Sequence, residues 1–189
     1  SITHPAVKKK ILHTILKEYF SSTETQFVIT RGDITSRDGV TPANVITKLK
    51  TEIDTVRTKY GYQWKDLIRI IHIADTDGTF TKDCVVKADV KSIQYYEDHM
   101  ESANVEVTQQ RNANKAEVMF KLSSTNKINS TDYRLYFNSC NLEHVLHNAL
   151  KDFSDGEKEE MSDAFAEKYK GHLPEFISFI SDPDIAVSG

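Results

Sequence analysis

The sequence predicts an α/β protein with a mostly parallel central sheet, helices on both faces of that sheet, and a helical C-terminal portion. Short runs rich in β-branched residues alternate with longer segments of helical periodicity, as in strands joined by helical crossovers. The most apolar run, residues 67–74 (LIRIIHIA), is nearly continuous, as expected for a strand covered on both faces. A chain of 189 residues fits one domain. We expect an α/β core over residues 1–150 and a helical extension over residues 151–189.

The first third of the chain predicts two helices and a strand before that apolar run. Residues 5–20 begin with a proline and repeat apolar side chains every three or four positions, which indicates a helix. Residues 26–30 (QFVIT) indicate a strand, and Arg31-Gly32-Asp33 reads as the turn after it. Residues 41–61 open on a Thr-Pro pair and close on a glycine, as a capped helix does.

The middle of the chain gives weaker patterns. Residues 89–100 fit either a helix or an extended segment, and residues 105–108 indicate a short strand. Asn112 suits the N-cap of a helix that carries apolar residues up to position 120. Residues 123–131 (SSTNKINST) have the composition of a loop.

The last third predicts one more strand and then only helices. Residues 133–137 (YRLYF) indicate the strand, and residues 142–150 indicate the helix after it. Ser154 and Glu157 form the pattern of a capping box at the start of another helix. A last short helix is expected over residues 174–180, after a proline.

Composition excludes several classes of protein. The net charge of −4 disfavours bulk binding of nucleic acid by electrostatics alone. Two cysteines without a secretory signal favour a reduced, cytoplasmic setting. No apolar run is long enough for a membrane span, so we expect no membrane partner. The absence of Walker, GxGxxG, GxSxG, HExxH and CxxC motifs disfavours the enzyme classes built on them.

An acidic loop, Asp75-Thr76-Asp77-Gly78, follows the most apolar strand and is the best candidate for an active site. Ligands of open α/β sheets bind beyond the carboxyl ends of strands. Asp75 and Asp77, two positions apart, can point the same way and would hold Mg²⁺ or Mn²⁺ between them. The alternative is that this segment is turn chemistry alone, since Asp and Gly are favoured in turns.

A second cluster lies between the last strand and its following helix. Glu143 is a carboxylate that would join the two aspartates if the two strands are neighbours. Cys140, His144 and His147 would instead hold Zn²⁺. Cys140 with His144 as its base is a third possibility. The remaining alternative is ordinary helix packing.

Two basic residues, Arg111 and Lys115, flank the expected helix start at Asn112. Near a helix N-terminus they would bind a phosphate group of a substrate. As an isolated pair they would simply be solvated. His72, within the apolar strand, is expected to be a hydrogen-bonded core residue rather than a metal ligand.

Two segments together resemble a known family. Residues 71–78 (IHIADTDG) and residues 136–147 (YFNSCNLEHVLH) are similar to the Toprim-like proteins of bacterial defence systems, in particular to the RloB-like branch and its relatives. The resemblance implies a Toprim-like fold and a metal site at Asp75 and Asp77. Many RloB-like proteins also carry an Asn-x-Cys segment with a glutamate ahead of a helix. The resemblance implies that Asn138, Cys140 and Glu143 are the corresponding residues here.

The function that this resemblance implies is divalent-metal chemistry on phosphodiesters, such as nicking or cleaving nucleic acid in phage defence. Asp75, Asp77 and Glu143 would then be catalytic, and Arg111 and Lys115 would bind substrate. Nucleic acid would be contacted through the metal site. The alternative is a non-catalytic chain that binds a partner protein or a nucleotide, so the sequence leaves open whether the protein is an enzyme.

Overall fold

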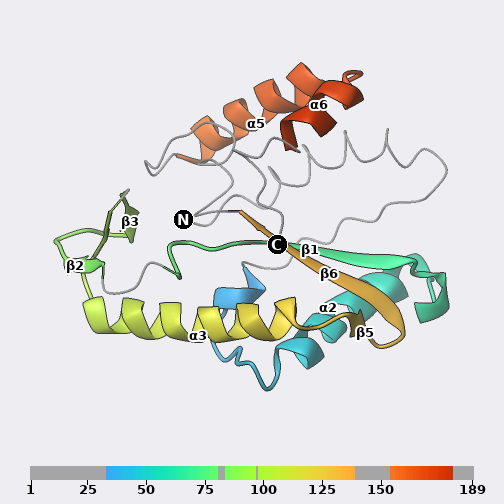
Figure 1. The fold of residues 1–189 in the computed structure, drawn as a ribbon, viewed down its shortest axis with the longest axis horizontal. Coiled ribbons are helices and arrows are strands. Elements are labelled where there is room, and N and C mark those ends of the chain that lie inside the picture. The colour runs from blue at the N-terminus through green and yellow to red at the C-terminus, as the bar shows by residue number, and fades with distance from the viewer. Residues whose placement is uncertain (1–32, 81–83, 97, 139–153, 181–189) are drawn as a thin grey trace. The chain divides into compact units, whose positions relative to one another are not determined.

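The computed structural model describes residues 33–80, 84–96, 98–138 and 154–180 (Figure 1). The chain forms two compact units, and the described residues up to 138 belong to the first while residues 154–180 belong to the second. The helices expected over residues 5–20 and 142–150 and the strand expected over residues 26–30 lie outside the described residues.

The first unit contains a small sheet with the order β1-β6-β5. Strand β1 (Arg69–Asp75) pairs in parallel with β6 (Thr131–Asn138), and β5 (Lys127–Ile128) pairs antiparallel with β6. The strands expected over residues 67–74 and 133–137 are confirmed, with bounds shifted by one or two residues. The hairpin formed by β5 and β6 occupies a segment expected to be loop.

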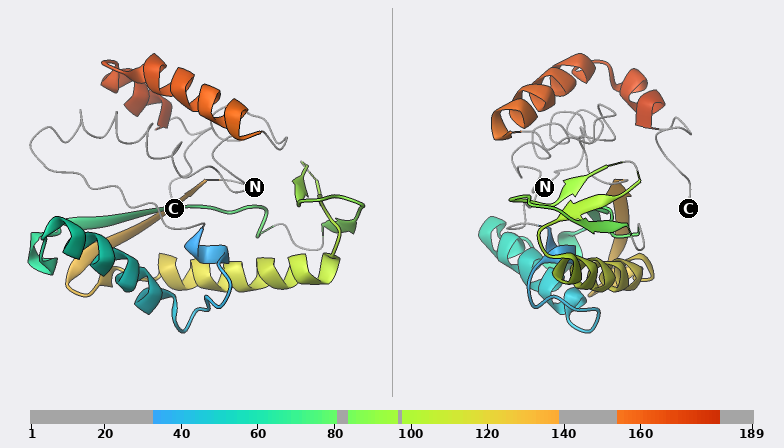
Figure 2. Two further views of the ribbon diagram at one scale, coloured as in Figure 1. Left: turned by 180° about the vertical axis from the view of Figure 1, so that it is seen from behind. Right: turned by 90° about the vertical axis from the view of Figure 1, so that its left-hand side faces the viewer.

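A second small sheet lies in the segment where the sequence shows no single pattern (Figure 2). Its strands are β2 (Val85–Lys87), β3 (Gln94–Tyr95) and β4 (Met100–Ser102), in the order β2-β4-β3. Strand β4 is parallel to β2 and antiparallel to β3. Residues 89–100 are therefore partly extended and do not form a helix.

The predicted mostly parallel central sheet is wrong. The described residues form two mixed three-stranded sheets and four helices instead. The error has a physical cause. Strands of two or three residues are too short to show an alternation of apolar and polar side chains, so the antiparallel partners β3 and β5 leave no periodic signal.

Helices α2 (Val45–Tyr60) and α3 (Val105–Ser123) pack against one face of the β1–β6 pair (Figures 1 and 2). A hydrophobic core lies between them, made of Ile34, Val40, Val45, Leu49, Val118, Leu122, Ile128 and Tyr133. On the opposite face of the pair, Ile71 and Tyr136 remain about half exposed. The expected helices on both faces are thus not found among the described residues.

Local capping is seen at the C-terminal end of α2 and at the N-terminal end of α3. Gly61 ends α2 in the left-handed conformation, with φ of 76°, as expected from the sequence. The predicted start of this helix at Thr41 is wrong: residues 42–44 form turns, and α2 begins at Val45 after Asn44. Asn104 begins α3 by accepting a hydrogen bond from the Val107 backbone N–H at 3.1 Å.

The start of α3 corrects two predictions. Residues 105–108 are helical and not a strand, since the Asn104 cap prevails over the short run with two valines. Asn112 lies inside α3 and does not cap it. Arg111 and Lys115 are consequently in the middle of a helix, where no backbone N–H groups are free to bind a phosphate.

The second unit consists, in its described part, of α5 (Asp155–Tyr169) and α6 (Leu173–Ile180). The predicted capping box is confirmed, since Ser154 accepts from the Glu157 backbone N–H and the Glu157 side chain accepts from Ser154. Phe165 packs edge-on against Phe176, with ring centroids 6.4 Å apart. None of the helices described here is both long and apolar enough to cross a lipid bilayer.

Candidate functional site

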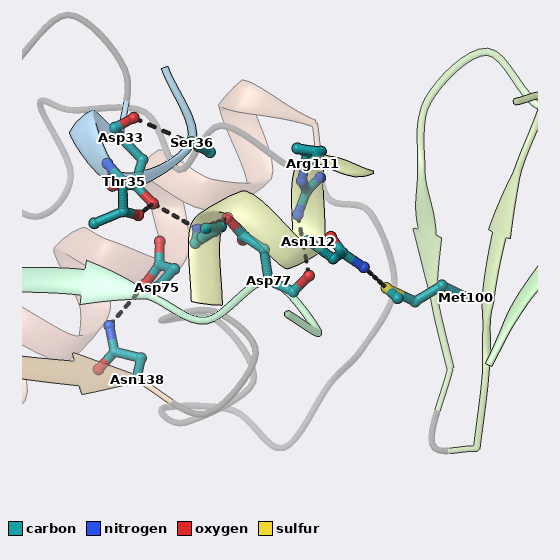
Figure 3. Close-up of polar contacts among 10 residues, drawn as sticks. Asp33, Thr35, Ser36, Asp75, Asp77, Met100, Arg111, Asn112 and Asn138 are labelled. Atoms are coloured by element: carbon teal, nitrogen blue, oxygen red, sulfur yellow. Dashed lines mark hydrogen bonds and ion pairs between the residues drawn. The ribbon is translucent and has the colours of Figure 1, made fainter. Parts of the chain in front are cut away.

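The carboxyl ends of β1 and β6 bring Asp75 and Asn138 side by side (Figure 3). Asp75 is paired in register with Asn138, and the Asn138 side-chain amide donates to Asp75 Oδ1 at 2.9 Å. The backbone N–H of Thr76 continues the ladder by donating to the Asn138 carbonyl at 3.1 Å. Because the strands are parallel and neighbours, Asp75 and Asn138 lie at the same edge of the sheet.

A tight turn follows β1 and buries the second aspartate. The Thr79 N–H donates to the Thr76 carbonyl at 2.9 Å. Asp77 and Gly78 both have left-handed backbone, with φ of 48° and 68°. Aspartate tolerates this conformation and glycine adopts it freely. The segment therefore forms a turn, and this turn places Asp77 inside the protein, 7% exposed.

The buried ammonium group of Lys115 holds two carboxylates together. Its Nζ lies 2.6 Å from Asp77 Oδ2 and 2.6 Å from Asp33 Oδ2, and the Lys115 side chain is 0% exposed. Buried lysines are almost always paired, because an unpaired ammonium is costly to remove from water. This ion-pair cluster joins α3 to the loop before α2 and to the turn after β1.

Asp33 has the most complete set of partners in the cluster. It caps the short 3₁₀ helix η1 (Ile34–Ser36), where its Oδ1 accepts from the Thr35 backbone N–H at 2.9 Å. Its Oδ2 accepts from the Thr35 hydroxyl at 2.7 Å as well as from Lys115. Burial alone would raise the pKa of Asp33, but the charge and hydrogen bonds of Lys115, with those of Thr35, hold that pKa below its ordinary value of 3.8.

The lowered pKa of Asp33 predicts a specific acid sensitivity. A carboxyl whose pKa is depressed by folding stabilises the protein fully above its unfolded pKa, and this contribution is lost as the pH falls through the folded pKa. We expect the free energy of unfolding of Asp33→Asn to depend less on pH than that of the wild type between about pH 2 and 5. Urea unfolding across this range measures it, with the exposed Asp38→Asn as control. If the free energy of unfolding changes with pH equally in the wild type and in Asp33→Asn, Asp33 is not the source of the acid sensitivity.

The Arg111 side chain contacts the backbone of the turn. Its Nη2 donates to the Asp77 carbonyl oxygen at 3.2 Å (Figure 3). Arg111 thus stabilises the turn conformation and leaves the Asp77 carboxylate to other partners. Together with Lys115, it places two positive charges around the second aspartate, from successive turns of α3.

Several buried polar atoms around the turn have no hydrogen-bond partner among the described residues. They are Asp77 Oδ1, Thr79 Oγ1, Asn112 Oδ1 and Arg111 Nε. A buried acceptor without a donor costs about 1–3 kcal/mol, and more when it is charged. Asp77 Oδ1 is the atom of greatest interest, because a carboxylate oxygen in this position is suited to bind a cation.

Within the described part of the chain, the ion-pair cluster and the neighbouring Asp75 sum to a negative charge. Asp33, Asp75 and Asp77 contribute three negative charges and Lys115 one positive charge, which leaves a formal charge of −2. Counting Arg111 as well leaves −1. The described residues include no group of three His, Cys, Asp or Glu side chains arranged around a common metal position. A cation here would rely on two carboxylates with water, which is common for Mg²⁺.

The structure describes some of the residues predicted for the site but not all of them. Asp75 and Asp77 lie at one edge as predicted, and Arg111 and Lys115 both reach the same turn. Lys115 contacts carboxylates, so its buried ammonium is not exposed to a phosphate in this structure. Glu143 lies outside the described residues, and so do the alternative zinc ligands Cys140, His144 and His147. His72 contacts the Tyr133 hydroxyl at 2.8 Å, in agreement with a core role.

Asp33 is the site residue that the sequence interpretation missed. It was expected to belong to a turn after a strand, and it lies 82 positions before Lys115. One signal was present in α3: Lys115, Val118 and Leu122 share the spacing of a buried helix face. A lysine on such a face requires an acidic partner, although its spacing does not identify which one.

Comparison with models of known protein families, with curated proteins and with solved structures finds no match. No family membership follows from these comparisons.

Proposed function

We propose that this protein is a Mg²⁺- or Mn²⁺-dependent, nuclease-like enzyme that processes phosphodiesters in the cytoplasm. The observation that carries the proposal is Asp77 Oδ1, a buried carboxylate oxygen without a donor among the described residues, at the same strand end as Asp75. The motif resemblance to Toprim-like defence proteins supplies the reaction class and a setting in phage defence.

Asp75 and Asp77 are the residues that would hold the cation. When bound there, a divalent cation would supply Lewis-acid chemistry, polarising a phosphoryl oxygen and lowering the pKa of a water molecule. The Asn138 amide orients the Asp75 carboxylate by its bond to Oδ1. Arg111 fixes the turn that carries Asp77, and Lys115 neutralises part of the negative charge that would otherwise separate the carboxylates.

Two further roles belong to the proposal. Glu143 would assist from the segment after β6, as the motif resemblance implies. Arg111 is the better candidate for steadying a phosphate, since the Lys115 ammonium is engaged by two carboxylates. The general acid of the reaction has no assigned residue.

Cleavage assays with single- and double-stranded DNA and RNA, each with Mg²⁺ or Mn²⁺, test the proposal. We expect Asp75→Asn and Asp77→Asn each to lower the cleavage rate at least about 100-fold, since removing a ligand or its charge impairs metal-dependent chemistry. Asp132→Asn is a matched control, because Asp132 lies on β6 at the end away from the site and is exposed. Circular dichroism of each variant establishes that it is folded.

Two outcomes of these cleavage assays would contradict the proposed enzymatic activity. If no nucleic acid is cleaved with either cation, or if Asp75→Asn cleaves like the wild type, the proposed activity is wrong.

A non-catalytic binding protein is the second candidate, and one observation favours it. Lys115 pairs with both Asp33 and Asp77, so two of the three carboxylates already have a counterion inside the protein. Such a cluster can serve to connect α3 to two loops without any cation. A protein of this kind would bind a protein or nucleotide partner, and its binding would be unchanged by Asp75→Asn and by removal of divalent cations.

A further inference from the structure

The two carboxylates of the ion-pair cluster, Asp33 and Asp77, differ in their hydrogen-bond partners. On one side, both oxygens of Asp33 are engaged, Oδ1 by the Thr35 N–H and Oδ2 by the Thr35 hydroxyl and Lys115. On the other side, Asp77 uses Oδ2 for Lys115, while Oδ1 has no donor among the described residues. Of the four carboxylate oxygens of this pair, Asp77 Oδ1 is therefore the one at which a cation would meet no competing hydrogen bond from the described residues.

The ammonium of Lys115 occupies the bridging position of the cluster. It lies 2.6 Å from one oxygen of each carboxylate, as a cation shared by two acids does. In enzymes with two metal ions, carboxylates share metals that lie about 3.5–4 Å apart. A second divalent cation between Asp33 and Asp77 would have to displace Lys115 or withstand its charge at close range.

Lys115 is not free to leave this position. Its side chain is fully buried, and it belongs to the face of α3 that carries the core residues Val118 and Leu122 (Figure 3 shows the cluster beside α3). Moving the ammonium into water would break two short ion pairs and leave both carboxylates buried without it. The bridging position is thus occupied by a buried side chain.

We infer that the site takes one divalent cation, held by Asp75 and Asp77, and that Lys115, held in place by Asp33, acts in place of a second metal ion. This inference rests on the proposed function and makes it more specific. Asp33 is then a positioning residue: it holds the ammonium and does not bind the metal. The reaction would then use one metal ion, with the Lys115 ammonium group at the other oxygen of the Asp77 carboxylate.

Counting bound Mn²⁺ tests the inference. Equilibrium dialysis and electron paramagnetic resonance of the purified protein should give one Mn²⁺ per chain, lost in Asp75→Asn and without coupling to a second ion. Asp33→Asn should keep one Mn²⁺, with affinity lowered by no more than about tenfold, because it removes a nearby charge and not a ligand. Lys115→Gln, if folded, should bind Mn²⁺ more tightly or admit a second ion.

Different results would contradict the one-metal inference and the proposed function. Two coupled Mn²⁺ ions in the wild type, or loss of binding in Asp33→Asn, would overturn the one-metal inference and leave the metal-dependent function standing. No Mn²⁺ that depends on Asp75 would overturn the proposed function itself. The wild-type count decides the question even if Lys115→Gln does not fold.

Discussion

Lys115→Met is expected to lower the free energy of unfolding by about 3–5 kcal/mol, because it leaves two carboxylates partly or fully buried without their shared ammonium. Methionine preserves most of the length and apolar volume of the lysine stem, so lost packing contributes little. The loss should be measured by urea unfolding in metal-free buffer. The single tryptophan, Trp64, lies between α2 and β1 in the first unit and provides the fluorescence signal.

Two comparisons isolate the charge effect in Lys115→Met. Lys121→Met, on an exposed position of the same helix, should change the free energy of unfolding by less than about 0.5 kcal/mol. Adding Asp33→Asn and Asp77→Asn to Lys115→Met should recover part of the loss, since the remaining groups are then neutral. A loss below about 1 kcal/mol for Lys115→Met alone would contradict a structural ion-pair cluster.

Gly78→Ala is expected to destabilise the first unit by about 2–5 kcal/mol, from backbone strain and overpacking together. Gly78 has φ of 68°, and a Cβ placed on it would lie 2.6 Å from the sulfur of Met100. Met100 is buried, so its side chain has little room to move aside. The same change would displace the turn that carries Asp77 and should weaken binding of Mn²⁺.

Gly39 offers a matched control for this substitution. Its φ of 69° is almost the same, but a Cβ there would meet nothing within 4 Å. Gly39→Ala should therefore cost only the strain of the left-handed conformation, about 1–2 kcal/mol. If Gly78→Ala and Gly39→Ala have equal effects in urea unfolding, close packing of the turn against Met100 is not important. The double variant Gly78→Ala/Met100→Ala should recover the packing part of the difference.

The elements that could be predicted from the sequence are those with long or well-capped patterns. The apolar run that forms β1 is visible because its residues are β-branched, and Gly61 and the Ser154 capping box define helix ends by local chemistry. The placement of Asp75 and Asp77 at the end of β1 follows from that strand alone. Asn138 reaches Asp75 because β6 is its parallel neighbour.

The elements that could not be predicted depend on contacts between distant segments. The two-residue strands β3 and β5 form because β4 and β6 supply hydrogen-bond partners, and their own residues carry no strand pattern. The start of α3 depends on one side chain, Asn104, against a local preference of valines for strands. The pairing of Lys115 with Asp33 joins residues 82 positions apart, so only the fold reveals it.

We propose above all that Asp75 and Asp77 together bind a divalent cation beside the Lys115 ammonium. A crystal structure of the protein soaked in Mn²⁺, with anomalous diffraction from the metal, tests it most directly. We expect one anomalous peak within about 2–2.5 Å of an oxygen of both Asp75 and Asp77, with Lys115 still between Asp33 and Asp77. A structure without a peak at these two residues, or with the metal elsewhere while Asp77 contacts only Lys115, would contradict the account.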